Sequence, residues 1–155
     1  MTSPRSRRAA GWWATATIVL ACLVGTVGSA SADAPLDVTG PVTDPAGVLG
    51  DRTAEVRAAL DKSFDRSGLQ LFVVLVPGFD GMDGQQWADR TAEISNVSDD
   101  DIVLAIATDD RAYGYSVADG HPLSDRDLER VEREDLLPRL RDEDWAGAAI
   151  AAAQG

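Results

Sequence analysis

The chain has very little cysteine and histidine, two residues on which nucleophilic catalysis often depends. Its 155 residues include one cysteine, Cys22, and one histidine, His121. A single cysteine excludes an internal disulfide, so the folded part must be stabilised by packing alone. No serine or cysteine has the sequence context of a nucleophile, and the Cys-x5-Arg, paired-histidine and Asp-x-Asp-Thr/Val signatures of phosphatases are missing. His121 precedes Pro122 and is interpreted as an exposed loop residue.

Charged residues are missing between Arg8 and Asp33, and this gap indicates a targeting segment. Three arginines precede it, residues 12–28 are apolar or small, and Ala30-Ser31-Ala32 fits a signal-peptidase site with cleavage after Ala32. The sequence therefore predicts a signal peptide over residues 1–32 and an extracytoplasmic protein, secreted or in the cell envelope. An uncleaved N-terminal membrane anchor is the alternative, because the uncharged stretch is long enough to cross a bilayer. Lipidation of Cys22 is a further reading.

Basic residues are scarce after this segment. From Asp33 onward the chain has 11 Lys or Arg and 26 Asp or Glu, a formal charge of −15. So acidic a surface repels phosphate backbones and anionic headgroups, which argues against nucleic-acid binding. Residues 33–41 read as a linker, and what remains is enough for one compact domain and too short for two.

The apolar pattern of residues 42–155 predicts alternating helices and strands. The run Leu69–Val76 is apolar on both faces, as in a strand covered by helices above and below. The runs 102–107 and 112–118, separated by Thr108-Asp109-Asp110-Arg111, predict a hairpin. Helices are expected from Asp51 to Gly68, from Asp83, from Ser124 to near Pro138, and from Asp144 to Ala153. This order predicts an α/β fold: a three-layer α/β/α sandwich whose mixed, mainly parallel central sheet contains one β-hairpin.

Aspartates follow the two apolar strands. Asp80 and Asp83 come after the first strand, and Asp109 and Asp110 come after the second. Ligands of open α/β sheets lie beyond the carboxyl ends of parallel strands, so these carboxylates are expected at one edge. They could hold calcium, or magnesium with added water. Aspartates are also common in turns, where they cap the backbone, and this alternative stays open. Arg111 could bind an anion or neutralise its acidic neighbours.

Four stretches in this order resemble the TPM-domain family, an extracytoplasmic α/β module of bacterial envelope and thylakoid-lumen proteins. They are Val42–Leu49 (VTDPAGVL), Gln70–Val76, Ile102–Val117 and Asp142–Ala148 (DEDWAGA). The resemblance covers residues 42–155. It implies a cation site formed by Asp44, Asp80, Asp100, Asp109 and Asp110.

Two functions follow from these observations. The first is a non-catalytic envelope module that binds a partner protein or a divalent cation, for which Ca²⁺ is the candidate. The resemblance also implies an alternative, a weak metal-dependent acid phosphatase with Arg111 as its anion contact. In either case the protein would be attached to the membrane only through its N-terminal segment, if that segment is not cleaved.

Overall fold

The computed structural model describes residues 33–155, so the expected signal peptide, its cleavage after Ala32 and the alternative anchor lie outside the described residues. No helix within residues 33–155 is both long and apolar enough to cross a bilayer. The strands are β1 (Val42–Thr43), β2 (Leu71–Val76), β3 (Ile102–Ala107) and β4 (Ala112–Val117). The α-helices are α1 (Thr53–Ser67), α2 (Gly84–Ser95), α3 (Asp125–Val131), α4 (Leu137–Arg141) and α5 (Trp145–Gln154).

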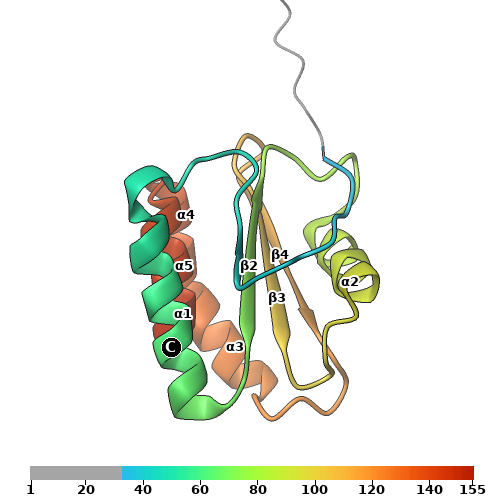
Figure 1. Ribbon diagram of the computed structural model, residues 1–155, viewed down its shortest axis with the longest axis vertical. Coiled ribbons are helices and arrows are strands. Elements are labelled where there is room, and N and C mark those ends of the chain that lie inside the picture. The colour runs from blue at the N-terminus through green and yellow to red at the C-terminus, as the bar shows by residue number, and fades with distance from the viewer. Residues whose placement is uncertain (1–32) are drawn as a thin grey trace, which may run out of the picture.

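One four-stranded sheet with the order β1-β2-β3-β4 forms the middle layer (Figure 1). The first three strands are parallel, and β4 returns antiparallel to β3 through the tight turn at residues 108–111. Helices α1, α4 and α5 lie on one side of the sheet, and α2 lies on the other. The predicted α/β/α sandwich with a mixed sheet and one hairpin is therefore confirmed.

Strands β2 and β3 are apolar at every position because both of their faces are covered. Val73 and Leu75 pack in the core beneath α1 and α5. Val74 and Val76 alternate with them and pack against Trp87 and Ala88 of α2. All six residues of β3 are buried. This is the pattern expected for central strands of a parallel sheet.

Helix ends are set by short polar side chains, mostly as the sequence indicates. The carboxylate of Asp83 accepts a hydrogen bond from Gln86 N at 2.8 Å, and Ser124 Oγ accepts one from Asp127 N at 3.3 Å. Asp144 accepts one from Gly147 N at 2.9 Å. Each of these bonds satisfies a free N–H in a first helical turn. The helix expected from Asp51 begins with a 3₁₀ turn at Gly50–Arg52, and α1 itself follows from Thr53 with Arg52 in the cap position.

The helix expected from Ser124 to Pro138 changes geometry along its length. After α3 the backbone widens into a π-helical turn at Glu132–Leu136, and α4 then begins with Pro138 in its first turn. Proline is tolerated there because an N–H in the first turn has no helical partner. The helix therefore falters just before the proline, as predicted.

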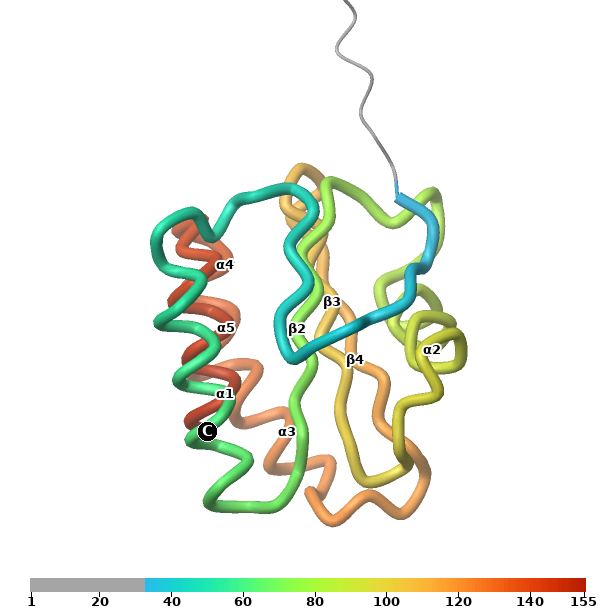
Figure 2. The backbone as a smooth tube through the Cα atoms, in the orientation of Figure 1, coloured from blue at the N-terminus to red at the C-terminus, as the bar shows by residue number. Residues whose placement is uncertain are grey.

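Residues 33–41, expected as a linker, form a strap packed along α2, which Figure 2 shows crossing in front of the sheet. Asp33 N donates to Gly78 O at 3.1 Å, and Val38 N donates to Ser95 Oγ at 2.9 Å. The indole N–H of the fully buried Trp87 donates to Asp33 O at 2.7 Å. The strap ends in β1, a strand that the sequence did not predict, because two residues are too few to show a period.

Helix α2 and strand β4 meet through two glycines. A Cβ atom built on Gly114 would lie 2.0 Å from the carbonyl carbon of Gly84 and 2.1 Å from its oxygen. Because real Cβ contacts are much longer, this approach is open only to glycine. The pair fixes the start of α2 against the middle of β4.

Candidate functional site

The loops after β1, β2 and β3 emerge at one edge of the sheet, here called the carboxyl edge. Val76 pairs with Ala107, so β2 and β3 end side by side. Beyond them Thr108 N donates to Val76 O at 2.8 Å and Asp109 N donates to Pro77 O at 3.0 Å. Asp44, Asp80, Asp109 and Asp110 all follow strand ends at this edge, as parallel topology requires.

Three loops at the carboxyl edge contain a residue with a left-handed backbone that is not glycine. These residues are Asp80 (φ 51°), Arg111 (φ 52°) and Glu143 (φ 57°). A residue with a side chain is strained in this region, at a cost of about 1–3 kcal/mol, and such residues concentrate at functional sites. Within residues 33–155 the fourth such residue is Asn96, which ends α2 at a position where asparagine is common.

Ion pairs connect these loops. The guanidinium of Arg111, at the hairpin tip, contacts the carboxylate of Glu143, which precedes α5. Arg52 donates to Glu55 at 2.9 Å and to Asp144 at 2.7 Å. The N–H of Gly147, and then Arg52, lower the pKa of the Asp144 carboxyl, because both stabilise its ionised form. Asp144 is thus a helix cap held as a carboxylate.

The five aspartates expected to bind a cation do not form one site. Both carboxylate oxygens of Asp44 accept backbone hydrogen bonds, from Val48 N at 3.1 Å and Leu49 N at 2.9 Å. Asp100 precedes β3, whereas Asp109 follows it, and a six-residue strand separates the two by about 20 Å. The carbonyl of Asp100 instead contacts His121 Nε2 at 2.9 Å. Including Asp100 in this set was wrong, because it lies at the opposite edge.

The remaining aspartates, Asp80, Asp109 and Asp110, are exposed. No group of three or more Asp, Glu, His or Cys side chains within residues 33–155 lies close enough to hold a metal ion. A calcium cage needs six to eight oxygens, so the described residues offer no ready-made one. Arg111 fits both of the roles expected for it. It neutralises an acidic residue, Glu143, and its side chain is exposed at the hairpin tip, where an anion could reach it.

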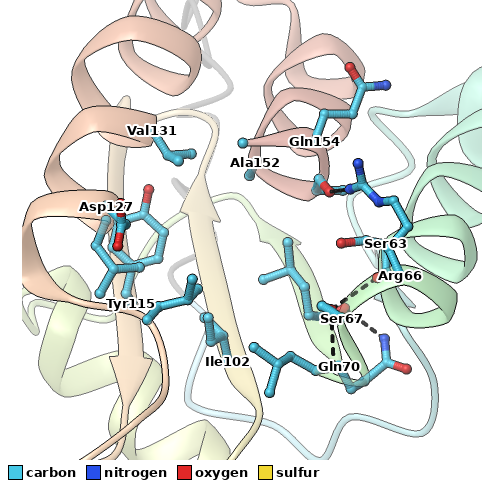
Figure 3. Close-up of a pocket in the computed structure, with 16 residues that line it drawn as sticks. Ser63, Arg66, Ser67, Gln70, Ile102, Tyr115, Asp127, Val131, Ala152 and Gln154 are labelled. Carbon is cyan, nitrogen blue, oxygen red and sulfur yellow. Dashed lines mark hydrogen bonds between the residues drawn. The ribbon is translucent and has the colours of Figure 1, made fainter.

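The sequence did not reveal a hollow at the opposite edge of the sheet, where β2 and β3 begin. It has a volume of about 340 Å³ and lies between α1, α3 and α5 (Figure 3). Its walls are mainly apolar, and its polar groups include Arg66, Tyr115 and Asp127. Leu123 and Leu128 lie on either side of Ser124, where the sequence predicts the start of a helix. Both leucines line the hollow, and no sequence period distinguishes such residues from core.

A sequence model described as the TPM domain matches residues 42–155. The chain belongs to the TPM domain family. This TPM domain is 40% identical over 129 residues to two curated proteins of Mycobacterium tuberculosis, UPF0603 protein MT2410 of strain CDC 1551 and UPF0603 protein Rv2345 of strain H37Rv. In each case the alignment covers 81% of this chain and 19% of the relative. The chain thus spans about a fifth of the length of these relatives.

Two structures solved by NMR in solution share the fold of this TPM domain. The N-terminal domain of cg2496 protein from Corynebacterium glutamicum aligns with a TM-score of 0.66 and 27% identity, covering 79% of this chain and 81% of that one. An N-terminal domain from P. gingivalis aligns with a TM-score of 0.61 and 20% identity, covering 73% and 76%. The second likeness shows the fold alone.

Proposed function

We propose that this TPM domain is a non-catalytic binding module of the cell envelope, and that the carboxyl edge of its sheet holds a basic segment of a partner protein. The envelope location rests on the basic, apolar and small-residue order of residues 1–32, which is typical of an export signal. The binding role rests on the geometry of the carboxyl edge.

The observation that carries the proposal is the convergence of strained loops with exposed carboxylates. Asp80 combines both features, and Arg111 follows the exposed pair Asp109 and Asp110 directly. Within residues 33–155 none of these three aspartates is in an ion pair. Unpaired acidic groups on rigid turns attract and orient basic side chains, and they raise association rates.

The same edge supports catalysis less well. A general acid or base is expected to have a pKa moved toward neutrality, which for a carboxyl is upward. The carboxyl pKa values of Glu55 and Asp144 at this edge are both shifted downward, that of Glu55 by its hydrogen bond from Arg52 and that of Asp144 by helix capping. A phosphate at Arg111 would also meet the negative charge of Glu143, which already pairs with the guanidinium. A calcium ion would find at most two carboxylates close together among the described residues.

The proposal is tested by ¹H–¹⁵N NMR titration of the protein with a synthetic oligolysine, and separately with CaCl₂ at matched ionic strength. Oligolysine is expected to shift the amide signals of Asp80, Gly81 and residues 109–112. The double variant Asp109→Asn/Asp110→Asn should bind oligolysine about fivefold more weakly, because an exposed ion pair contributes about 0.2–1 kcal/mol. The variant Asp99→Asn/Asp100→Asn makes the same charge change at the opposite edge and should have little effect.

Three results would contradict the proposal. Equal weakening by both double variants would mean that only net charge attracts the peptide. Shifts at these residues with calcium alone would make a cation the ligand. Hydrolysis of an aryl phosphate that is abolished both by a chelator and by Arg111→Ala would establish the metal-dependent phosphatase instead.

A further inference from the structure

The ion pair between Arg111 and Glu143 joins two turns of the carboxyl edge, both of which lie at the top of Figure 1. Arg111 ends the turn between β3 and β4, and Glu143 lies in the turn between α4 and α5. Both residues have left-handed backbones, with φ angles of 52° and 57°. Two strained turns therefore present opposite charges to each other.

Glycine is the usual residue at both of these backbone positions. In a hairpin turn a left-handed residue is most often glycine, because glycine has no Cβ. At the end of α4, Glu143 N donates to Leu140 O at 3.2 Å, and Asp144 N donates to Arg139 O at 2.9 Å. These two bonds form a Schellman motif, whose left-handed residue is commonly glycine. Within residues 33–155 five glycines occupy other positions with positive φ, so the chain has the usual solution elsewhere.

The stability of the fold does not explain why Arg111 and Glu143 stand at these positions. Both side chains are more than half exposed, and an exposed ion pair contributes little to stability. A left-handed residue with a side chain costs at least as much free energy as such a pair returns. Strain that stability does not repay is typical of functional sites. The pair therefore calls for a role beyond folding.

The ion pair determines which carboxylates of the hairpin turn stay without a partner. Arg111 directly follows the exposed Asp109 and Asp110, and the long side chain of an arginine could pair with either. Its guanidinium instead contacts Glu143, 32 positions further along the chain. Within residues 33–155 neither aspartate is in an ion pair. The negative charge of the hairpin turn is thus left free.

We propose that Glu143 is a positioning residue that holds Arg111 away from Asp109 and Asp110, so that both carboxylates can receive the basic side chains of a partner segment. This inference rests on the proposed function, which places the basic segment at the same edge. Glu143 acts through Arg111 and does not itself contact the partner. Without Glu143, the guanidinium competes with the partner for the two aspartates.

The test is a double-mutant cycle in the oligolysine NMR titration. Glu143→Gln should weaken oligolysine about threefold, because it releases Arg111 to pair with the aspartates. Arg111→Gln should bind oligolysine at least as tightly as the unchanged protein. The double variant Arg111→Gln/Glu143→Gln should stay within about twofold of Arg111→Gln, because no cation is left to compete.

Asp51→Asn is the matched control for charge. Asp51 is exposed at the carboxyl edge and is in no ion pair within residues 33–155, so its neutralisation frees no cation. This variant should weaken oligolysine less than about twofold. A second comparison checks the backbone. Glu143→Gly and Glu143→Ala should weaken oligolysine alike, whereas the glycine variant should melt about 4 °C higher because it relieves the left-handed strain.

Three results would overturn the inference. A double variant that binds as weakly as Glu143→Gln would mean that Glu143 shapes its turn and does not control Arg111. An effect of Glu143→Gln no larger than that of Asp51→Asn would mean that only net charge matters. Equal melting temperatures for Glu143→Gly and Glu143→Ala would remove the strain from the argument. In each case the proposed function stands if Asp109→Asn/Asp110→Asn weakens oligolysine, and it fails only if the unchanged protein does not bind oligolysine at this edge.

Discussion

A methyl group at Gly114 is the sharpest probe of how α2 is fixed to the sheet. The Cβ of Gly114→Ala would lie 2.0 Å from a backbone carbon of Gly84, whereas carbon atoms pack best at about 3.5–4.0 Å. The start of α2 must therefore retreat by roughly 1.5 Å. Both partners are backbone, so no rotamer change relieves the contact. The helix that moves carries the fully buried Trp87 and Ala88.

The size of the effect follows from the kind of clash. Overpacking a core costs about 1–3 kcal/mol, and a clash between backbones belongs at the upper end, about 3 kcal/mol. The entropy of unfolding is about 2.1 cal/mol/K per residue, or roughly 0.26 kcal/mol/K for residues 33–155. The melting temperature of Gly114→Ala should therefore fall by about 12 °C.

Thermal unfolding followed by circular dichroism measures this change. Gly40→Ala is the matched control, because a Cβ at Gly40 meets nothing within 4 Å and its φ is not positive. Its melting temperature should stay the same or rise slightly, since alanine restricts the unfolded chain. If Gly114→Ala melts within about 2 °C of the unchanged protein, the close approach of α2 and β4 does not exist and the reasoning is refuted.

Three further predictions concern stability. Trp87→Phe removes the indole N–H bond to Asp33 and some buried volume, and should lower the free energy of unfolding in urea by about 2–3 kcal/mol. Asp144→Ala loses a helix cap worth about 1 kcal/mol at pH 7. Because the folded pKa of Asp144 is lowered, its contribution is complete above the unfolded pKa and should shrink as pH falls through the folded value, as acid-range melts would show. Arg111→Ala breaks an exposed ion pair and should cost less than about 1 kcal/mol in urea unfolding, an effect that salt reduces.

The sequence predicts the fold well where a local rule decides the structure. Asp83, Ser124 and Asp144 mark helix starts because the capping hydrogen bond spans only two or three residues. Gly68 ends α1 in a left-handed conformation (φ 74°), as its position after the last apolar residue predicts. The apolar runs of β2 and β3 indicate central strands for the same local reason.

Features that depend on residues far apart in the chain could not be predicted from the sequence. Ile94 has helical spacing with Trp87, yet it is 50% exposed, because helical spacing does not tell how far the packed surface reaches. The short β1 exists through its pairing with Val73 and Val74. For the candidate site, topology correctly brought Asp80 and Asp109 to one edge, whereas the placement of Asp100 there ignored the length of β3. The apolar hollow could not be foreseen, since lining and core residues look alike along the chain.

The contacts of the strap determine where this folding unit starts. The family match begins at Val42, but the acceptor for the Trp87 indole is the carbonyl of Asp33. Shortening the protein to the matched residues would remove the acceptor of that N–H. It would also expose to solvent the side of α2 that Val38 covers. Anyone preparing the isolated module should retain the nine residues ahead of the match, because Val38 and Leu36 pack into the core beside α2 and Asp33 accepts the indole hydrogen bond.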